Sequence, residues 1–349
     1  MGLMLRTFGW ALATTVVALA VAGVLGGGNA LALVAILIVL EISLSFDNAV
    51  VNAAVLGRLS AFWQKLFLSV GVVVAVFGMR VLFPLVIVGV TAHLGPAEAF
   101  RLARAGGSRD TPGTYANVLQ AAHPQIAAFG GVFLLVLFLD FVLDPRRELH
   151  WLTWLEVPLA RIGRLKQLPV VVAVVALVAV AEAFAEDVGK VMVAGSLGLV
   201  GYVLIHGLGE LFEAQGHDRV TGGGGAQLVG RAAASLFCYL EVLDASFSLD
   251  GVIGAFAISQ NIFVIAAGLG VGAMYIRSLT VFLVRSRTLG RYVFLEHGAM
   301  WAIGALSVIL LVSIGHEAPD VATGLLGVCF IGGAFASSLA RNRRREVPG

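Results

Sequence analysis

Charged residues are scarce in this chain. They make up 13% of its 349 residues, whereas soluble globular chains average about 25%. Hydrophobic residues account for 59% of the sequence, and the mean hydropathy is +0.96. A single soluble core could not bury so many apolar side chains. The composition therefore excludes an ordinary water-soluble domain and indicates a lipid bilayer as the solvent.

Cysteine and catalytic motifs are also scarce. Cys238 and Cys329 lie inside apolar runs, and we interpret them as packing residues rather than a disulfide or a metal pair. The glycine run at residues 222–225 lacks a Walker lysine and is read as a flexible connector. No Ser-His-Asp order or HExxH pair appears. We expect no enzyme, no organic cofactor and no nucleic-acid partner, and an intramembrane enzyme is the weakest alternative.

Long apolar runs occupy most of the chain. A helix needs about 20 apolar residues to cross a bilayer, and about ten segments come near this length. They lie near residues 8–26, 30–57, 66–91, 125–143, 168–185, 190–213, 226–258, 261–284, 292–315 and 319–340. The sequence therefore predicts an all-α, polytopic membrane protein, with residues 1–349 forming a single integral membrane domain.

The distribution of cations predicts how this domain is oriented. Arginine and lysine gather at alternate ends of the predicted spans, and the positive-inside rule places those ends in the cytoplasm. They are Arg58, Lys65, Arg146, Arg147, Arg161, Arg164, Lys166, Arg285, Arg287, Arg291, Arg341, Arg343, Arg344 and Arg345. We expect an inner-membrane protein with both termini inside. The loop at 92–124 is expected outside, although it carries arginines.

Two segments allow alternative interpretations. Residues 1–26 resemble a secretory signal, because Arg6 precedes an apolar stretch and an Ala-Leu-Ala site ends at Ala20. We favour a retained helix, and cleavage stays open. Residues 144–167 carry Trp151, Trp154 and other apolar residues at helical spacing beside several cations. This pattern suits an interfacial cytoplasmic helix, and an ordinary helix packed on the protein suits it equally.

Two segments far apart in the sequence share an acidic pattern. Residues 41–47 read Glu-Ile-Ser-Leu-Ser-Phe-Asp, and residues 244–250 read Asp-Ala-Ser-Phe-Ser-Leu-Asp. The offset is constant, since 244 − 41 and 250 − 47 both equal 203. Arg80 and Arg277 form a second echo. Both echoes are five predicted spans apart, and an odd displacement reverses the direction of crossing. The sequence therefore predicts an inverted-topology repeat, with halves near 8–185 and 190–340.

The acidic residues of these motifs are costly inside a membrane. A carboxylate at the bilayer centre costs about 2.5–3.5 kcal/mol, so five of them would cost roughly 12 kcal/mol if unpaired. Protons, the two arginines or a bound cation must offset this cost. Helical spacing puts the motif groups on two stripes, so we expect helix breaks near Ser43–Ser45 and Ser246–Ser248 to gather them. Carboxylate, hydroxyl and amide oxygens suit Mg²⁺, Ca²⁺ or Mn²⁺.

The motifs resemble those of the TerC family of integral membrane proteins, named for tellurium resistance. The resemblance rests on residues 41–49 and 244–250, covers roughly 30–340, and includes a stretch at 292–306 typical of a long, uncharacterised branch. Gly251 departs from it, since that family often has a polar residue there. The resemblance implies metal-ion efflux, with manganese as cargo. The candidate metal-site residues are Glu41, Asp47, Asn48, Glu241, Asp244 and Asp250, supported by Ser43, Ser45, Ser246, Ser248, Arg80 and Arg277.

The leading hypothesis is therefore an exporter of divalent metal ions. The alternative is a membrane scaffold in tellurium or envelope stress resistance. The expected partners are the bilayer and the metal ion, and a homo-oligomer or a cytoplasmic stress-protein partner stays open.

Other polar residues allow narrower expectations. Asp140 and Asp144 are expected to pair with Arg146 and Arg147. His297 is either a proton carrier or a core histidine with its hydrogen bonds satisfied.

Overall fold

The computed structural model describes residues 2–163, 165, 167–216, 228–259, 261–286, 291–316 and 320–346. Across these ranges the regular structure is helical, apart from one isolated bridge between Leu59 and Leu228. The all-α prediction is confirmed. The glycine run at 222–225 lies outside the described residues.

Several helices are long and apolar enough to cross a membrane. Within the described ranges there are six such segments: Thr7–Ser43, Ala61–Val90, His123–Val142, Ile262–Arg285, Leu295–Val312 and Leu325–Arg343. Two shorter apolar helices, Leu168–Phe184 and Val188–Leu204, accompany them. In lipid only a helix satisfies every backbone polar group within one segment. The chain is therefore a multi-pass membrane protein.

The chain forms two compact units. The first contains Met1–Ala49, Ser60–His123 and Leu240–Phe282, and the second contains Val50–Leu59, Pro124–Tyr239 and Leu283–Gly349. Each unit therefore joins segments that are distant in the sequence.

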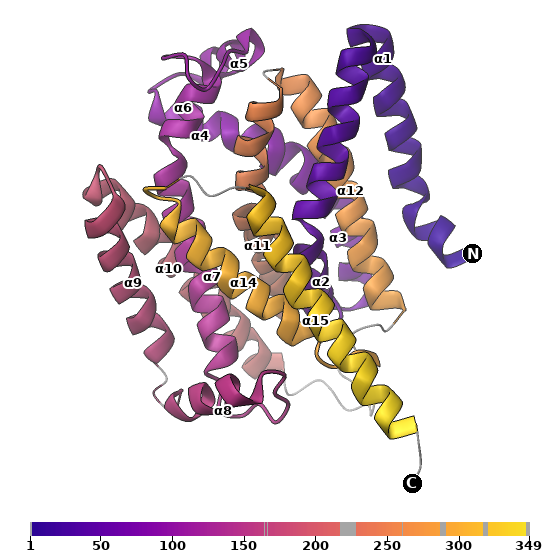
Figure 1. Ribbon diagram of the computed structural model, residues 1–349, viewed down its shortest axis with the longest axis vertical. Coiled ribbons are helices and arrows are strands. Elements are labelled where there is room, and N and C mark those ends of the chain that lie inside the picture. Colours follow the sequence, from indigo (N-terminus) through magenta and orange to yellow (C-terminus); the bar gives the residue numbers. More distant parts are fainter. Residues whose placement is uncertain are drawn as a thin grey trace. The chain divides into compact units, whose positions relative to one another are not determined.

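The first unit begins with a helical hairpin, α1 (Gly2–Leu44), whose two arms are visible in Figure 1. The chain reverses at Gly27, which has a φ of 72°, a left-handed value that glycine adopts without a Cβ penalty. Ala18, Leu19 and Ala22 of the first arm pack on a core that includes Val34. The first arm covers the predicted span 8–26, and the second arm covers only the first part of the predicted span 30–57.

The rest of the first unit is also helical. A long helix runs without interruption from α3 (Ala61–Val73) through the π-helical η1 (Val74–Leu82) to α4 (Phe83–Thr91). In its π turn the Phe83 N–H donates to the Gly78 carbonyl, five residues earlier. Two short helices follow, α5 (Pro96–Ala105) and α6 (Tyr115–Ala121), and α12 (Ile262–Arg285) packs on the second arm of α1.

Two helices divide between the units. Helix α2 (Phe46–Leu56) begins in the first unit and leaves it after its first turn, and α11 (Gly230–Ile258) enters the first unit near its middle and ends there. Helices α7 (His123–Val142) and α12 cross a boundary only at their ends.

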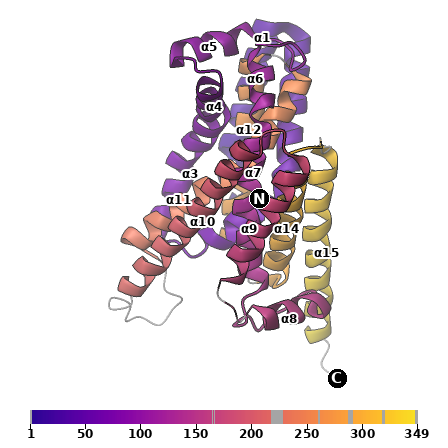
Figure 2. The same cartoon turned by 90° about the vertical axis from the view of Figure 1, so that its left-hand side faces the viewer.

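The second unit is built on α7 (His123–Val142), which is buried along most of its length. Around it lie α9 (Leu168–Phe184), α10 (Val188–Gly216), α14 (Leu295–Val312) and α15 (Asp320–Glu346). Close approaches at glycine make this packing possible: a Cβ on Gly304 of α14 would lie 2.8 Å from the Phe138 ring of α7. The short helix α8 (Thr153–Ile162) lies crosswise at one end of this unit (Figure 2).

Candidate ion-binding site

The first acidic motif contributes a buried ion pair in the first unit. Glu41, near the end of α1, is 2% exposed, and its Oε1 accepts a hydrogen bond from Nη2 of Arg80 in η1. The Ser45 hydroxyl donates to the same oxygen over 3.0 Å. The other arm of the guanidinium, Nη1, donates to the Ala75 carbonyl over 2.7 Å. Arg80 thus neutralises Glu41, as its cost in a membrane requires.

The second motif contributes a buried triad. Nη1 and Nη2 of Arg277 in α12 lie 3.1 Å from the two carboxylate oxygens of Glu241, and Nη2 is 3.3 Å from Asp244 Oδ2. The guanidinium also lies over the Phe67 ring, 3.9 Å from its centre. A planar guanidinium suits such a site because it binds a carboxylate with two hydrogen bonds and stacks on an aromatic ring. Both arginines therefore contact motif acids, which is one of the three ways in which the cost of these acids could be offset.

One hydrogen bond joins the two motifs. The Asn48 amide, in the first turn of α2, donates from Nδ2 to Asp244 Oδ1 over 2.7 Å. Both groups are buried and both belong to the first unit. The motifs lie 203 residues apart in the sequence, yet this contact brings Asn48 of the first motif to Asp244 of the second. We refer to the two buried clusters together as the acidic network: Glu41 with Ser45 and Arg80, and Asn48 with Asp244, Glu241 and Arg277.

The helix breaks follow the prediction at one motif only. Ser45 is a turn between α1 and α2, although its N–H still donates to the Glu41 carbonyl over 3.0 Å. The predicted break near Ser246–Ser248 is wrong, because α11 is helical throughout. A serine hydroxyl can donate to a carbonyl of its own helix and leave the helix intact. Ser43 does this: its exposed hydroxyl donates to the Val39 carbonyl over 2.8 Å, outside the buried network.

The remaining candidates have helical backbones, but their side chains lie outside the described residues. They are Asp47, Ser246, Ser248 and Asp250. The described network holds three carboxylates (Glu41, Glu241 and Asp244) and two guanidinium groups (Arg80 and Arg277). Among the side chains that are described, no group of three or more His, Cys, Asp or Glu residues is arranged to hold a metal ion.

Gly71 in α3 makes room for the second arginine. A Cβ at this position would collide with Arg277 Nη1 and lie 2.8 Å from Glu241 Oε1. We expect Gly71→Ala to lower the midpoint of thermal unfolding in detergent, because it pushes the guanidinium off its carboxylate. Gly78→Ala in the same long helix is the control, since its Cβ would meet only Val74 at 3.5 Å. Alanine there should raise stability by about 0.5–1 kcal/mol. Equal stability of the two variants would contradict this role of Gly71.

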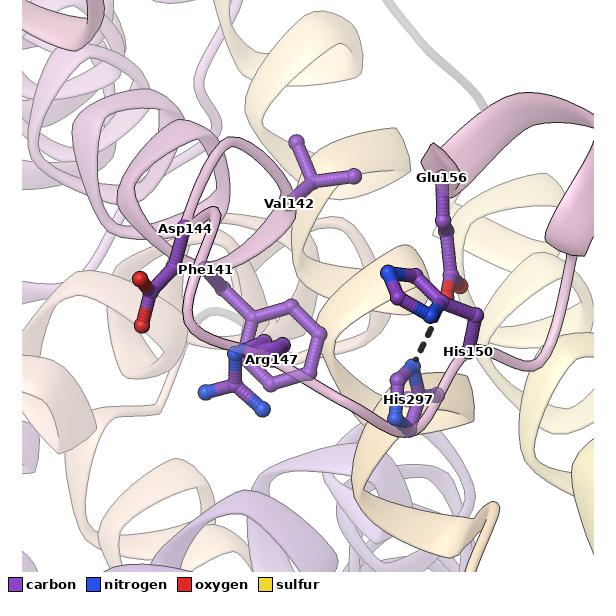
Figure 3. Close-up of a pocket in the computed structure, with 7 residues that line it drawn as sticks. All are labelled: Phe141, Val142, Asp144, Arg147, His150, Glu156 and His297. Carbon is purple, nitrogen blue, oxygen red and sulfur yellow. Dashed lines mark ion pairs between the residues drawn. The ribbon is translucent and has the colours of Figure 1, made fainter. Parts of the chain in front are cut away.

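Another buried acid, Glu156 of α8, lies in the second unit (Figure 3). Its Oε1 accepts from Trp301 Nε1 over 2.8 Å, and its Oε2 accepts from the Trp151 N–H over 2.9 Å and lies 3.1 Å from His297 Nδ1. Burial alone would raise the pKa of Glu156, but these donors outweigh it and lower the pKa to about 2. We missed this acid in the sequence because it lies off the predicted apolar stripe, roughly 200° round the helix from Trp154.

The contacts of Glu156 bear on the expectations for His297 and for the helix at residues 144–167. His297 is 3% exposed and its Nδ1 lies 3.1 Å from Glu156 Oε2, and both interpretations of this histidine stay predictions. Helix α8 packs on the protein through Glu156, while Trp154 on another face is 74% exposed. Its contact with a membrane surface stays a prediction. The cavity beside Glu156, lined by His150, Arg147 and Asp144 among others (Figure 3), has room for roughly one water molecule.

The arginines after α7 behave partly as expected. Arg146 pairs with Asp144 over 3.1 Å. Arg147 instead lies over the Phe141 ring, 3.4 Å from its centre, and approaches Glu296 at 3.7 Å. The predicted pairing of Asp140 with these arginines is wrong. Asp140 accepts a hydrogen bond from Tyr202 of α10, because the chain leaves α7 at Val142 and carries the arginines away from the helix.

Comparison with known proteins gives a family. No curated protein matches the chain, and no solved structure matches it. A family model does match, over a region that includes Asn48, Asp244 and both arginines and starts after Glu41. Residues 46–345 match the family described as "Protein of unknown function (DUF475)", and the chain therefore belongs to that family.

Proposed function

We propose that this protein exports divalent metal ions, with manganese as the preferred cargo, through the acidic network of the first unit. The observation that carries the proposal is the hydrogen bond from Asn48 to Asp244, which joins two acidic motifs inside apolar helices. Ionisable groups in such helices are costly, and they mark ion pathways by default. The protein acts as a transporter in this proposal, and metal is its substrate.

The charges of the network support a cation as its ligand. Counted with Asp47 and Asp250, the motifs and Glu241 hold five carboxylates against two arginines. The excess is three negative charges, 5 − 2, which one divalent ion and one proton together neutralise. The guanidinium groups contact the carboxylates in the structure, and in this proposal the cation replaces them.

The chemistry of the donors narrows the cargo. Carboxylates, the Asn48 amide and hydroxyls such as that of Ser45 are hard oxygen donors, which favour Mg²⁺, Ca²⁺ or Mn²⁺ over soft metals. The resemblance of residues 41–49 and 244–250 to TerC proteins selects manganese and export. In this proposal the arginines must release their carboxylates before the metal binds.

The proposal also includes the number of spans, their repeat and their orientation, which go beyond the observed helices. It has about ten spans, the number that the length rule suggests, arranged as an inverted repeat in the inner membrane with both termini cytoplasmic. The contact between Asn48 and Asp244 supports it, because inverted repeats place their ion site where the halves meet. In intact cells the thiol of Arg343→Cys should then fail to react with a membrane-impermeant maleimide, whereas the thiol of Gly107→Cys should react with it.

The metal content of cells tests the function. Cells with the protein should hold less manganese than cells without it when excess manganese is added. Magnesium, calcium, zinc and copper are added in parallel experiments. If the cellular content of one of these metals falls in the same way, the protein exports that metal as well. Unchanged content for every metal would overturn export and favour the scaffold, whose cytoplasmic loops would then matter more than its acids.

A further inference from the structure

The second unit contains an intramembrane acid that the metal site does not use. Asp140 lies in α7, two residues before the helix ends at Val142, and Tyr202 of α10 donates its hydroxyl to Asp140 Oδ2. Tyr202 is 3% exposed. One turn earlier in α10, a Cβ on Gly198 would collide with the Phe129 carbonyl of α7. The two helices therefore touch at this glycine, which brings the tyrosine within reach of the acid.

A histidine extends this pair toward the surface. His206, one turn after Tyr202 on the same face of α10, stacks on the tyrosine ring with 5.4 Å between centres and 11° between planes. Its side chain is exposed, whereas Tyr202 is buried. On the other side, Phe133 of α7 packs edge-on against the tyrosine at 5.7 Å. The polar groups thus run from a carboxylate through a phenol to an exposed imidazole.

The charges near Asp140 differ from those near the motif acids. Glu41, Glu241 and Asp244 each lie in contact with an arginine. Within the described part of the chain, no cation lies at ion-pair distance from Asp140.

Two other charged groups, Arg58 and Asp144, lie in this part of the second unit. Tyr239 of α11 is within electrostatic reach of both Asp140 and Arg58. On the following turn, Asp144 is held by Arg146. A carboxylate in an apolar span without an arginine is relieved of its cost by a proton.

We propose that Asp140 and Tyr202 form a proton-binding site, with His206 at its exposed end, and that proton uptake there is coupled to metal export. The proton adds to the Asp140 carboxylate and comes from water by way of the imidazole. Tyr202 keeps its own proton, because a protonated carboxyl still has a carbonyl oxygen that accepts the phenol. The coupling rests on the proposed metal export, whereas the proton site does not.

The proton site can be tested without any metal. The infrared difference spectrum of the purified protein, acidic minus neutral buffer, should contain a carboxylic-acid band that Asp140→Asn removes. Tyr202→Phe should shift this band to higher frequency, because the carbonyl loses its hydrogen bond while the ring keeps its shape. Asp144→Asn is the control, one turn further along the chain, and should leave the band in place. A band unaffected by Asp140→Asn or Tyr202→Phe overturns the site.

The coupling is tested in proteoliposomes that contain a pH dye and are given a manganese gradient. The parent protein should move protons against the manganese flux. In Asp140→Asn the manganese flux should stay within about twofold of the parent's, while the proton flux should fall at least tenfold. Asp144→Asn should match the parent in both fluxes. Full proton flux in Asp140→Asn overturns the coupling. A parent protein that moves no manganese overturns export and with it the coupling, and the infrared result still decides the proton site.

Discussion

Arg277→Met is expected to destabilise the protein by about 3–5 kcal/mol, the usual result of removing one partner of a buried ion pair. The change leaves Glu241 and Asp244 facing each other without their shared guanidinium. It also removes the stacking on Phe67, whose ring centre lies 3.9 Å from the guanidinium carbon. The methionine side chain fills similar space, so the loss reports charge rather than a cavity. Thermal unfolding in detergent, followed by circular dichroism, measures the effect.

Two further variants make this test specific. Arg104→Met removes an exposed arginine of α5 in the same unit and should change stability by less than about 0.5 kcal/mol. Arg277→Met combined with Glu241→Gln and Asp244→Asn should recover most of the loss, because the amides need no countercharge. If Arg277→Met were as stable as Arg104→Met, Arg277 would not be the cation that stabilises these acids.

The helices were predictable because their cause is local. A bilayer has no water to satisfy the backbone, so apolar runs must be helical wherever they cross. The turn at Gly27 falls within a Gly-Gly-Gly-Asn stretch, which provides the φ freedom that a tight reversal needs. The pairing of Arg80 and Arg277 with acids was predictable from energy alone, since neither charge is tolerated singly in an apolar span.

Other features depend on packing that no sequence pattern encodes. The π turn around Arg80 and the glycine gap at Gly71 arise from how the helices meet. The break expected near Ser246–Ser248 failed because serine does not by itself interrupt a helical backbone, and α11 is helical throughout. The partner of Asp140 was missed because Tyr202 lies 62 residues away in the sequence, and an arginine six residues away looked closer.

Asp47→Asn and Asp250→Asn are each expected to abolish protection against excess manganese. Each change keeps the shape of the side chain and removes one charge from the motifs. The site would lose one anionic oxygen donor and the attraction of one full charge for the cation in a low-dielectric region. Growth in manganese and the metal content of the cells measure the effect, with membrane insertion followed by immunoblotting of the membrane fraction.

The insertion measurement separates a lost site from a lost protein. An amide is cheaper to bury than a carboxylate, so both variants should insert at the level of the parent. Asp110→Asn, in the exposed loop after α5, is the control and should protect fully. Asp47 and Asp250 occupy equivalent positions in the two motifs. Asp47→Asn and Asp250→Asn should therefore both lose protection against manganese. If both variants insert normally and still lower cellular manganese, the acids are not the transport site, and the scaffold becomes the better account of this membrane protein.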